Sequence, residues 1–522
     1  MAVKVVTVAQ MQALEDASER AGVSKDTLME NAGLACAQQV RRHMGGTAGR
    51  KTLLLIGPGN NGADGLVIAR HLRRWGAEVC CYVVRGRPDH DPKMTDALRY
   101  DVDVVDAEQD PGFARLQEWL FSSSVVVDAI LGAGRYRPLE GAVGEVVELV
   151  NRYRSSGSDC SVISIDLPTG VNPDTGATDE NALVADVTLA LCYPKFGIVN
   201  FPGAGYAGRI VVLGIGLPLQ AREGIDLPVE WMSDSAAADL LPPRPLDSHK
   251  GTYGHLLIVA GSRNFVGASV LAAMAAHRVG AGLVTLATPE SVYPIAASKL
   301  TETIHLPLPE DADGRVNATA VEVIEERLGG YSALAVGCGL GLSPGTAAFM
   351  ERLLLANTDL PMPPVVIDAD GLNNLARCEA WPSRLHSSAV LTPHPGEMAT
   401  LTRQLTAGVQ ADRLGIAGSS AVEWGQTVLL KGAHSIVASP DGPRCILPFA
   451  NPALAAGGTG DVLTGIIGGL LAQGLSPYEA AQLGGYLHGS AGEVARNSVG
   501  SAGVVASDLL LHIPQIIDQL RG

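Results

Sequence analysis

A glycine-rich loop that ends in an aspartate is the strongest chemical signal in this chain. Residues 451–461 read NPALAAGGTGD, and an apolar helical run follows from Val462 to about Gln473. Glycines let the backbone approach a phosphate closely, and the N–H groups at the start of a helix can hold the anion. Asp461 then stands where it can take a proton from a hydroxyl beside that phosphate. The loop therefore predicts activation of an alcohol by phosphoryl transfer.

The same loop also has a purely structural explanation, in which its glycines let a helix pack closely against a sheet. A single GGxG pattern would favour that explanation. The aspartate at the start of the helix, together with the motifs described next, favours the chemical one.

Polar residues follow three expected strands of the first half. The stretch 57–65 (GPGNNGADG) follows a strand and opens a helix, as in a dinucleotide-binding turn, although its spacing is not GxGxxG. Because parallel strands deliver their carboxyl ends to one crevice, we expect convergence of four side chains there: Asn61, Asp128, Asp166 and Thr169. Such side chains can hold a ligand or a hard cation. Each aspartate alone would be better explained as the cap of its turn.

The second half carries a series of short motifs at expected strand ends and helix starts. In chain order these are KGTYGH at 250–255, GCGLG at 337–341, DADGLN at 368–373, TPHPGE at 392–397 and KGAHS at 431–435. A lone PHPGE can be a turn with a surface histidine, and Lys431 can be an ordinary lysine at a strand end. The series in this order is much more specific than any one of its members.

Apolar strands that alternate with helices must position these residues, and the alternation indicates a doubly wound α/β sheet in each half. In the first half we expect strands at 52–56, 78–84, 124–128, 161–166, 186–192 and 209–213. Helices are expected at 65–75 and 142–154, after a helical lead-in at 8–43 whose second stretch Ser24 or Asp26 can cap. In the second half we expect strands at 255–260, 283–287, 332–337, 364–368, 389–392, 427–431 and 434–438. Helices are expected there at 268–280, 318–328, 345–356, 461–473, 477–497 and 505–520.

The length and one proline-rich seam predict two domains. A chain of 522 residues exceeds one ordinary core. The seam at about 217–248 contains PPRP at 242–245, after which the strand–helix alternation restarts. We therefore expect a first domain at 1–225 and a second at 226–522, with the boundary near 220–240.

The composition excludes several classes of function. The chain is 47% hydrophobic, has 61 glycines and carries a net charge of −16 with a pI near 5.2. That charge argues against general nucleic-acid binding and against attraction to an anionic membrane. The eight cysteines lack CxxC or zinc-like spacing, so we expect small core residues in a reducing cytoplasm. No signal peptide and no bilayer-spanning segment is predicted.

The first half resembles a known family. The segments GPGNNGADG, VVVDAILGAG and SIDLPTGVNPDTG are similar to the N-terminal domain of the bifunctional NAD(P)H-hydrate repair enzymes, which epimerises the hydrated cofactor NAD(P)HX. The resemblance implies a Rossmann-like three-layer fold. It also implies a potassium ion at Asn61, Asp128 and Thr169, and substrate contacts at Asn60, Asn61, Gly62, Ala63, Asp64, Gly132, Ala133, Gly134, Arg135, Tyr136, Arg137, Pro138 and Asp166. Ala63 stands where the family usually has glycine, and Thr169 where serine is common.

The second half resembles the ribokinase-like superfamily, and closely the ADP-dependent NAD(P)HX dehydratases. The match lies in HKGTYGHLLIVAGS, DADGLNNL, TPHPGE, LLKGAHS and NPALAAGGTGDVLTGIIGGLLAQG, over nearly all of 245–515. The resemblance implies ADP contacts at Lys431, Gly432, Ala433, His434, Ser435, Gly458, Thr459 and Gly460. It places Ala268, Gly339, His394 and Asp461 at the hydrated nicotinamide. Cys338 replaces a common proline, Gly371 a common alanine and Thr459 a common serine, and none of these changes removes a charged or catalytic group.

These resemblances predict a cofactor-repair enzyme that is both an isomerase and a lyase. Asp166 would serve epimerisation, and Asp461 would free the substrate hydroxyl for attack on ADP, the co-substrate. Mg²⁺ would bridge the phosphates in the second domain, and K⁺ would serve the first. We expect NADHX and NADPHX as substrates and a homo-oligomeric assembly.

Two rival functions stay open from the sequence. A small-molecule kinase of a vitamin precursor would share the glycine–aspartate loop but would release a stable phosphate ester. Alternatively, the first half is a non-catalytic binding module, against which Asn61, Asp128 and Asp166 argue. The choice between ADP and ATP stays open from physical reasoning alone, as does the preference for NADHX or NADPHX.

Overall fold

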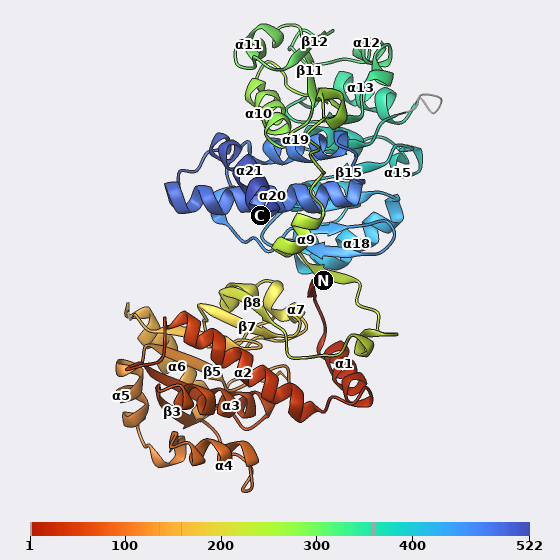
Figure 1. The fold of residues 1–522 in the computed structure, drawn as a ribbon. Coiled ribbons are helices and arrows are strands. Elements are labelled where there is room, and N and C mark those ends of the chain that lie inside the picture. Colours follow the sequence, from red (N-terminus) through yellow and green to blue (C-terminus); the bar gives the residue numbers. More distant parts are fainter. Residues whose placement is uncertain (1–2, 135, 158, 357–361) are drawn as a thin grey trace. The chain divides into compact units, whose positions relative to one another are not determined.

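The computed structural model describes residues 3–134, 136–157, 159–356 and 362–522. The chain divides into two compact units, Lys4–Leu227 and Pro228–Gly522, and Val3 belongs with the second. Each unit contains its own sheet with helices packed on it (Figure 1), so the α/β class expected for both halves is confirmed. Arg135, expected at the first site, lies outside the described residues. No helix in the described ranges combines the length and the apolar character that a membrane crossing requires.

The first unit is built on seven parallel strands in the order β4-β3-β2-β5-β6-β7-β8. The strands are β2 (Lys51–Ile56), β3 (Glu78–Val83), β4 (Asp103–Asp106), β5 (Val125–Ala129), β6 (Ser161–Ile165), β7 (Val187–Leu191) and β8 (Arg209–Leu213). The chain runs from β2 outward to β4 and then returns to β5 on the other side of β2. The carboxyl ends of β2 and β5 therefore form a topological switch point, where parallel sheets bind ligands.

Helices cover both faces of this sheet. Its helices are α1 (Val8–Arg20), α2 (Lys25–His43), α3 (Asn60–Arg74), α4 (Pro92–Arg99), α5 (Ala114–Ser122), α6 (Ala142–Ser155), α7 (Phe196–Val199) and α8 (Ala204–Ala207), with 3₁₀ turns η1 (Ala107–Gln109) and η2 (Leu219–Arg222). One apolar core joins α2, α3 and α4 to one face, and a second joins α5 and α6 to the other. The expected three-layer arrangement is confirmed. Ser24 caps α2 through a hydrogen bond from the Thr27 N–H, as one of the two expected caps.

The second unit has a mixed sheet in the order β1-β9-β18-β17-β16-β15-β14-β13-β10-β11-β12. The strands are β1 (Val3–Lys4), β9 (Val229–Trp231), β10 (His255–Val259), β11 (Leu283–Pro289), β12 (Ile304–Leu308), β13 (Ala333–Val336), β14 (Val365–Ile367), β15 (Ala389–Leu391), β16 (Thr427–Leu430), β17 (Ile436–Ala438) and β18 (Arg444–Ile446). The strands from β16 to β12 in that order are parallel, and β17 runs antiparallel to both of its neighbours. The loops after β13, β14, β15 and β16, which carry four of the second-half motifs, therefore leave the sheet along one edge, whereas KGTYGH precedes β10 and lies at the opposite edge.

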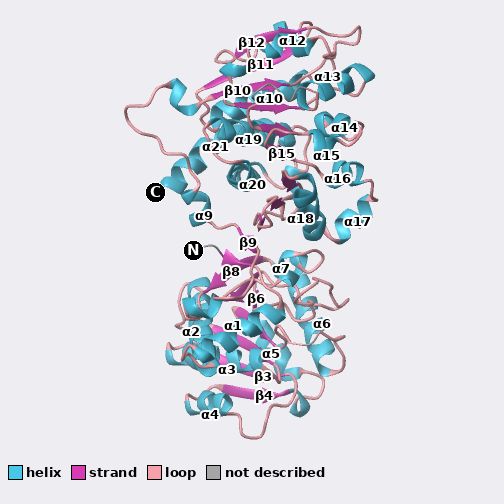
Figure 2. Ribbon diagram, turned by 90° about the vertical axis from the view of Figure 1, so that its right-hand side faces the viewer, coloured by secondary structure: helices cyan, strands magenta, loops and turns pink. Residues whose placement is uncertain are grey.

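Helices also lie on both sides of this second sheet (Figure 2). They are α9 (Asp234–Asp239), α10 (Val266–Arg278), α11 (Tyr293–Ala297), α12 (Ala320–Glu325), α13 (Pro344–Leu354), α14 (Asp370–Leu375), α15 (Trp381–Arg384), α16 (Pro395–Thr402), α17 (Thr406–Ala411), α18 (Arg413–Trp424), α19 (Thr459–Ala472), α20 (Pro477–Val499) and α21 (Ala506–Arg521). The 3₁₀ turns are η3 (Lys250–Tyr253), η4 (Leu328–Gly330) and η5 (Pro452–Leu454). A large apolar core joins α10, α19, α20 and α21 to one face of the sheet. The apolar run after Asp461 is thus a helix buried against this sheet.

Within the described chain, none of the eight cysteines forms a disulfide, and seven of them are buried. That agrees with the expectation of small core residues. Burial raises the pKa of the Cys36 and Cys81 thiols well above the usual value, so both stay protonated at neutral pH.

Candidate active sites

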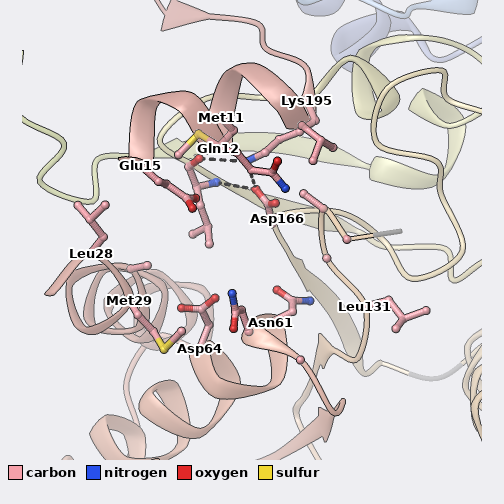
Figure 3. Close-up of a pocket in the computed structure, with 18 of the residues that line it drawn as sticks. Met11, Gln12, Glu15, Leu28, Met29, Asn61, Asp64, Leu131, Asp166 and Lys195 are labelled. Atoms are coloured by element: carbon pink, nitrogen blue, oxygen red, sulfur yellow. Dashed lines mark hydrogen bonds and ion pairs between the residues drawn. The ribbon is translucent and has the colours of Figure 1, made fainter. Parts of the chain in front are cut away.

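The first unit encloses a cavity of about 400 Å³ at the switch point of its sheet. Its walls come from the loops after β2, β5 and β6, and from α1 and α2. Figure 3 shows Asn61 and Asp64 on one side of this cavity, facing Asp166 and Glu15 on the other. The three loops that the sequence singled out in this half therefore meet at one place.

Close backbone contacts shape the loop after β2. A side chain on Gly57 would collide with the carbonyl of Ile130, because its Cβ would lie 1.8 Å from that oxygen. At Gly62 the Cβ would lie 2.0 Å from the Gly57 carbonyl oxygen. Arg87 donates hydrogen bonds to the carbonyls of Gly57 and Gly59, the second at 3.1 Å. Glycine at positions 57 and 62 therefore permits this close turn, and the hydrogen bonds from Arg87 hold its backbone in place.

Asp166 forms a buried ion pair with Lys195. The Lys195 ammonium donates to Asp166 Oδ1 at 2.5 Å, and the lysine side chain is only 2% exposed. The Leu191 N–H donates to the same oxygen at 3.3 Å. Asp166 has a φ of 66°, a left-handed conformation that aspartate adopts more readily than most residues. This geometry fixes the carboxylate at the cavity wall with a proton donor beside it.

Two further carboxyls face the same cavity. Burial raises the pKa of Asp64 well above its usual value, and the nearby charges of Asp166 and Glu15 add to that shift. Burial also raises the pKa of Glu15, although Lys195 opposes the rise. The cavity therefore combines an ammonium group with carboxyls that hold protons more tightly than carboxyls in water, which suits proton exchange with a bound molecule.

Asp128 lies fully buried below the loops, and its carboxylate accepts four hydrogen bonds. The Thr169 hydroxyl donates to Oδ1 at 2.7 Å and the Thr169 N–H to Oδ2 at 2.9 Å. Ser164 donates its hydroxyl to Oδ2 and Ile130 its N–H to Oδ1. Burial raises the pKa of Asp128 despite these bonds. Among the described residues no basic side chain lies within ion-pair distance of it.

Asn61 has the features of a neighbouring cation ligand. It is 8% exposed, and its amide oxygen is of the kind that a hard cation takes as a ligand. Its amide Nδ2, which is a donor, has no hydrogen-bond partner in the described chain. A Cβ on Gly132 would lie 3.1 Å from its amide carbon, so Asn61 packs against the loop after β5. A buried carboxylate without a cationic partner, beside amide and hydroxyl oxygens, is a donor set that fits a monovalent cation.

The other residues expected at this site occupy several environments. Those that line the cavity are Asn60, Asn61, Asp64, Gly132, Ala133, Gly134, Arg137 and Asp166. Tyr136 and Pro138 are exposed and do not contribute to its walls. Gly62 and Ala63 are buried in the first turns of α3. Ala63 has ordinary helical backbone geometry, so alanine is accommodated there without strain.

In the second unit, Asp461 lies in the first turn of α19. Gly458 precedes the helix with a φ of 93°, which favours glycine. Burial raises the pKa of Asp461 to about 6, opposed by a hydrogen bond from the Cys338 thiol and reinforced by the charge of Asp368. A carboxylate with this pKa is ionised at neutral pH and still accepts a proton readily, as a general base must.

An ion-pair network beside the helix that carries Asp461 joins three of the motifs. Asp368 accepts a 2.6 Å hydrogen bond from the Lys431 ammonium and another of 2.6 Å from the Thr464 hydroxyl. Lys431 also lies 3.6 Å from Glu397. Burial favours a lower pKa for Lys431, but the negative charges of Asp368 and Glu397 have the larger combined effect, so the pKa of Lys431 is raised. The DADGLN, TPHPGE and KGAHS motifs thus meet around one lysine.

His394 begins α16, and its ring orientation is fixed by backbone donors. Its Nδ1 accepts hydrogen bonds from the N–H groups of Gly396 and Glu397 at 3.0 and 3.2 Å. The Glu397 carboxylate in turn accepts a hydrogen bond of 2.8 Å from the backbone N–H of His394. Since Nδ1 is an acceptor, the neutral ring carries its proton on Nε2. The side chain is 56% exposed, which leaves it available to a ligand.

The remaining expected residues of this site also lie close together. A Cβ on Gly339 would lie 3.0 Å from the Ala268 Cβ, so α10 and the loop after β13 are in contact. The Lys431–Ser435 segment turns back on itself, because the Ser435 hydroxyl accepts from the Gly432 N–H and donates to the Gly432 carbonyl. His434 has a φ of 49° within that turn. A Cβ on Gly460 would lie 3.6 Å from Lys431 Nζ, which places the two expected nucleotide-binding loops side by side.

Sequence reasoning missed several of these residues. Lys195 and Glu15 were not predicted for the first site, and Asp368, Glu397 and His488 were not predicted for the second. His488 donates a 2.9 Å hydrogen bond to the carbonyl of Thr459, and burial lowers its pKa to about 4, so it is neutral. The lysine in the YPKFG segment and the first acid of DADGLN were the available signals, because charged residues in apolar surroundings usually have a partner.

Comparison with known proteins assigns each half to a family. The family model described as NAD(P)H-hydrate dehydratase matches residues 256–515, and the one described as YjeF-related protein N-terminus matches residues 25–197. Both lie within the units described above.

Full-length relatives match the whole chain. The bifunctional NAD(P)H-hydrate repair enzyme Nnr of Moorella thermoacetica is 39% identical over 99% of this chain and 97% of its own length. The protein of the same name from Thermofilum pendens is 38% identical over 99% of this chain and 97% of its own length. Among solved structures, an ADP/ATP-dependent NAD(P)H-hydrate dehydratase from Bacillus subtilis, co-crystallised with ATP/Mg²⁺, is 31% identical. It covers 55% of this chain and 97% of that one, with a TM-score of 0.49. The fusion, the order of its halves and the identity over the full length together show that the chain belongs to the family of bifunctional NAD(P)H-hydrate repair enzymes.

Proposed function

We propose that this chain restores hydrated NADH and NADPH to the active cofactors in two steps. The first unit interconverts the R and S epimers of NADHX and NADPHX. The second dehydrates the S epimer with ADP, which is converted to AMP and phosphate. One observation carries the proposal: Asp461, a half-buried carboxyl with a pKa of about 6, lies in the first turn of a helix behind a glycine loop, near the Asp368–Lys431 pair.

Asp461 serves as the general base for dehydration. In the hydrated cofactor a hydroxyl is bonded to the carbon next to the ring nitrogen, and hydroxide is a poor leaving group. Asp461 takes the hydroxyl proton while the oxygen attacks the β-phosphorus of ADP, so AMP departs and a phosphate ester forms. The nitrogen lone pair then expels phosphate, and loss of a proton from the neighbouring carbon restores the double bond.

The loops around Asp461 hold the two reactants. The backbone of Gly458, Thr459 and Gly460 faces the transferring phosphoryl group, and the segment from Lys431 to Ser435 holds the nucleotide. Ala268, Gly339 and His394 contact the hydrated nicotinamide. Two observations support this placement of the three residues: Ala268 is in contact with Gly339, and the ring of His394 is exposed.

A magnesium ion fits this second site only together with the nucleotide. No group of three or more His, Cys, Asp or Glu side chains suited to a metal ion occurs in the described parts of the chain. Asp368 is bonded to Lys431 and Thr464, and Glu397 lies beside Lys431. Mg²⁺ commonly keeps its waters and uses substrate phosphates as ligands. It would therefore be held chiefly by phosphate oxygens and would reduce the repulsion between ADP and the surrounding acids.

In the first unit Asp166 is the proposed acid–base residue of epimerisation, with Lys195 as its proton-donating neighbour. The substrate would occupy the 400 Å³ cavity that both residues line. K⁺ would be held by Asn61, Asp128 and Thr169. Its support is the buried Asp128 carboxylate, which has no cationic partner in the described residues, and the buried Asn61 side chain, whose amide oxygen is a suitable ligand.

The two activities are proposed to belong to 1–225 and 226–522, and the assembly to be a homo-oligomer. The experiment that tests the overall function uses an epimer mixture of hydrated NADH with ADP, with ATP or with no nucleotide. Recovery of dihydronicotinamide absorbance should require a nucleotide. A stable phosphate ester as the end product would instead indicate the kinase alternative.

A further inference from the structure

We propose that Arg413 is a further nucleotide-binding residue of the second unit, and that its guanidinium holds a phosphate oxygen of the nucleoside diphosphate. This inference rests on the proposed ADP-dependent function of that unit. Arg413 is the first residue of α18 and belongs to none of the motifs by which the sequence indicated the site.

Arg413 lies directly against the proposed nucleotide loop. A Cβ on Gly432 would lie 2.4 Å from Arg413 Nη1 and 2.9 Å from Nη2, so a side chain there would displace the guanidinium from this position. Gly432 has a φ of 141°, a conformation that also favours glycine. Arg413 Nη2 donates a long hydrogen bond of 3.4 Å to the carbonyl of Leu430, the last residue of β16. The guanidinium therefore borders the Lys431–Ser435 segment from the side of α18.

The charge of Arg413 has no carboxylate partner among the described residues. Its hydrogen bonds go to neutral oxygens, Gln410 Oε1 at 3.3 Å and the Leu430 carbonyl at 3.4 Å. Burial lowers the pKa of Arg413, and no acidic neighbour offsets that effect. A guanidinium has five N–H donors, so several stay available. A partly buried cation of this kind is energetically unfavourable unless an anion pairs with it.

The neighbouring lysine cannot supply this charge. Lys431 is bonded to Asp368 at 2.6 Å and lies 3.6 Å from Glu397, so its charge is already balanced within the protein. Asp461 adds a third carboxylate to the site. A nucleoside diphosphate would bring further negative charge to these acids, and Arg413 is the adjacent cation without an acidic partner in the described chain. Guanidinium also matches a phosphate group through paired N–H···O bonds.

The test compares two ligands that differ in their phosphates. Mg²⁺–ADP and adenosine are titrated into the full-length chain by calorimetry, for the natural protein and for Arg413→Gln and Arg413→Lys. We expect Arg413→Gln to raise the Kd for Mg²⁺–ADP by about tenfold or more, because a hydrogen bond to a charged group is lost. The Kd for adenosine should stay within about twofold. Arg413→Lys should give an intermediate Kd for ADP, because lysine keeps the positive charge but lacks the paired N–H donors of the guanidinium.

Kinetics and a matched control complete the design. At saturating ADP, Arg413→Gln should leave the KM for the hydrated cofactor unchanged. Arg496→Gln, which removes a surface arginine paired with Glu493, should change neither the affinity for Mg²⁺–ADP nor that for adenosine. Equal losses for ADP and adenosine would show that Arg413 only supports the fold and would overturn the inference. So would an Arg413→Gln protein that binds ADP as tightly as the natural chain. If the natural chain itself failed to bind ADP, the proposed function would fall as well.

Discussion

Lys431 and Asp368 are joined by a 2.6 Å ion pair between the carboxyl ends of β16 and β14, although 63 residues separate them in the chain. The Asp368 side chain is 2% exposed, and its second oxygen accepts from Thr464 in α19. This pair therefore connects the helix that carries Asp461 to the loop proposed to bind the nucleotide.

Lys431→Met should destabilise the second unit by about 3 kcal/mol or more, because it leaves Asp368 buried without its cation. Hydrogen exchange in increasing urea, followed by mass spectrometry on peptides from β14 and β16, measures the change. Peptides of the first unit serve as the internal reference. Lys299→Met removes an exposed lysine and should stay within about 0.5 kcal/mol of the natural protein. Equal protection in both variants would show that the pair contributes little.

Asp461→Asn should abolish nucleotide-dependent dehydration and leave the fold and epimerisation intact. Asparagine keeps the size of the side chain but cannot accept the hydroxyl proton, and loss of a general base typically costs ~10²–10⁴-fold. Single-turnover recovery of dihydronicotinamide absorbance from the S epimer with ADP measures the effect. Dehydration near the natural rate would remove Asp461 from the mechanism.

Dehydration should lose activity on the acidic side with a midpoint near pH 6. Burial raises the pKa of Asp461 to about 6, so the carboxylate is the base above that pH and is protonated below it. The kcat/KM for the S epimer should be constant above about pH 7, and well below about pH 6 it should fall tenfold for each pH unit. A profile that stays level down to pH 4.5 would contradict this assignment.

Several parts of this structure were predictable from the sequence. Apolar runs such as 52–56 and 255–260 became buried parallel strands, and the periodic segment 477–497 became the long helix α20. The fold class and the family are confirmed. Site residues at strand ends were accessible to prediction because a parallel sheet brings those ends to one edge.

Other elements gave too weak a local signal. β4 reads DVVD, with an acid at each end and partial exposure, so it does not resemble a buried strand. β12 contains Pro307, and β18 has only three residues, Arg444–Ile446. The helices α16 and α18 are rich in small residues and begin at His394 and Asp412 caps rather than at a long apolar stripe. Their existence depends on packing that no local pattern records.

The partners of the acidic residues were also inaccessible. Asp166 and Lys195 are 29 residues apart and belong to loops after different strands. Sequence alone marks each as polar at the end of an apolar segment, and only the sheet order brings them within hydrogen-bond distance. The same holds for Arg413, whose position becomes informative only because the fold brings its guanidinium against Gly432.

Potassium should support epimerisation through Asp128. Its buried carboxylate lacks a cationic partner among the described residues, so a small monovalent ion should stabilise the site, whereas a bulky organic cation should not. Epimerisation followed by chromatography in K⁺ and in tetramethylammonium should differ, and Asp128→Ala should remove the difference. The Ser122→Ala variant, which changes an exposed hydroxyl, is the control. Equal rates in both salts, with Asp128→Ala also silent, would exclude the ion.

The central claim is that two separate sites perform two successive steps, and stereochemically resolved consumption of the epimers tests it most directly. Purified R and S forms of hydrated NADH are supplied with ADP to the natural chain, to Asp166→Asn and to a fragment covering 230–522. The natural chain should consume both epimers quickly. Asp166→Asn should consume the S epimer at the normal rate and the R epimer only at its slow spontaneous rate of inversion, and a folded fragment should behave in the same way. A folded fragment that consumes both epimers quickly would contradict the account, because the first unit would then not be the epimerase.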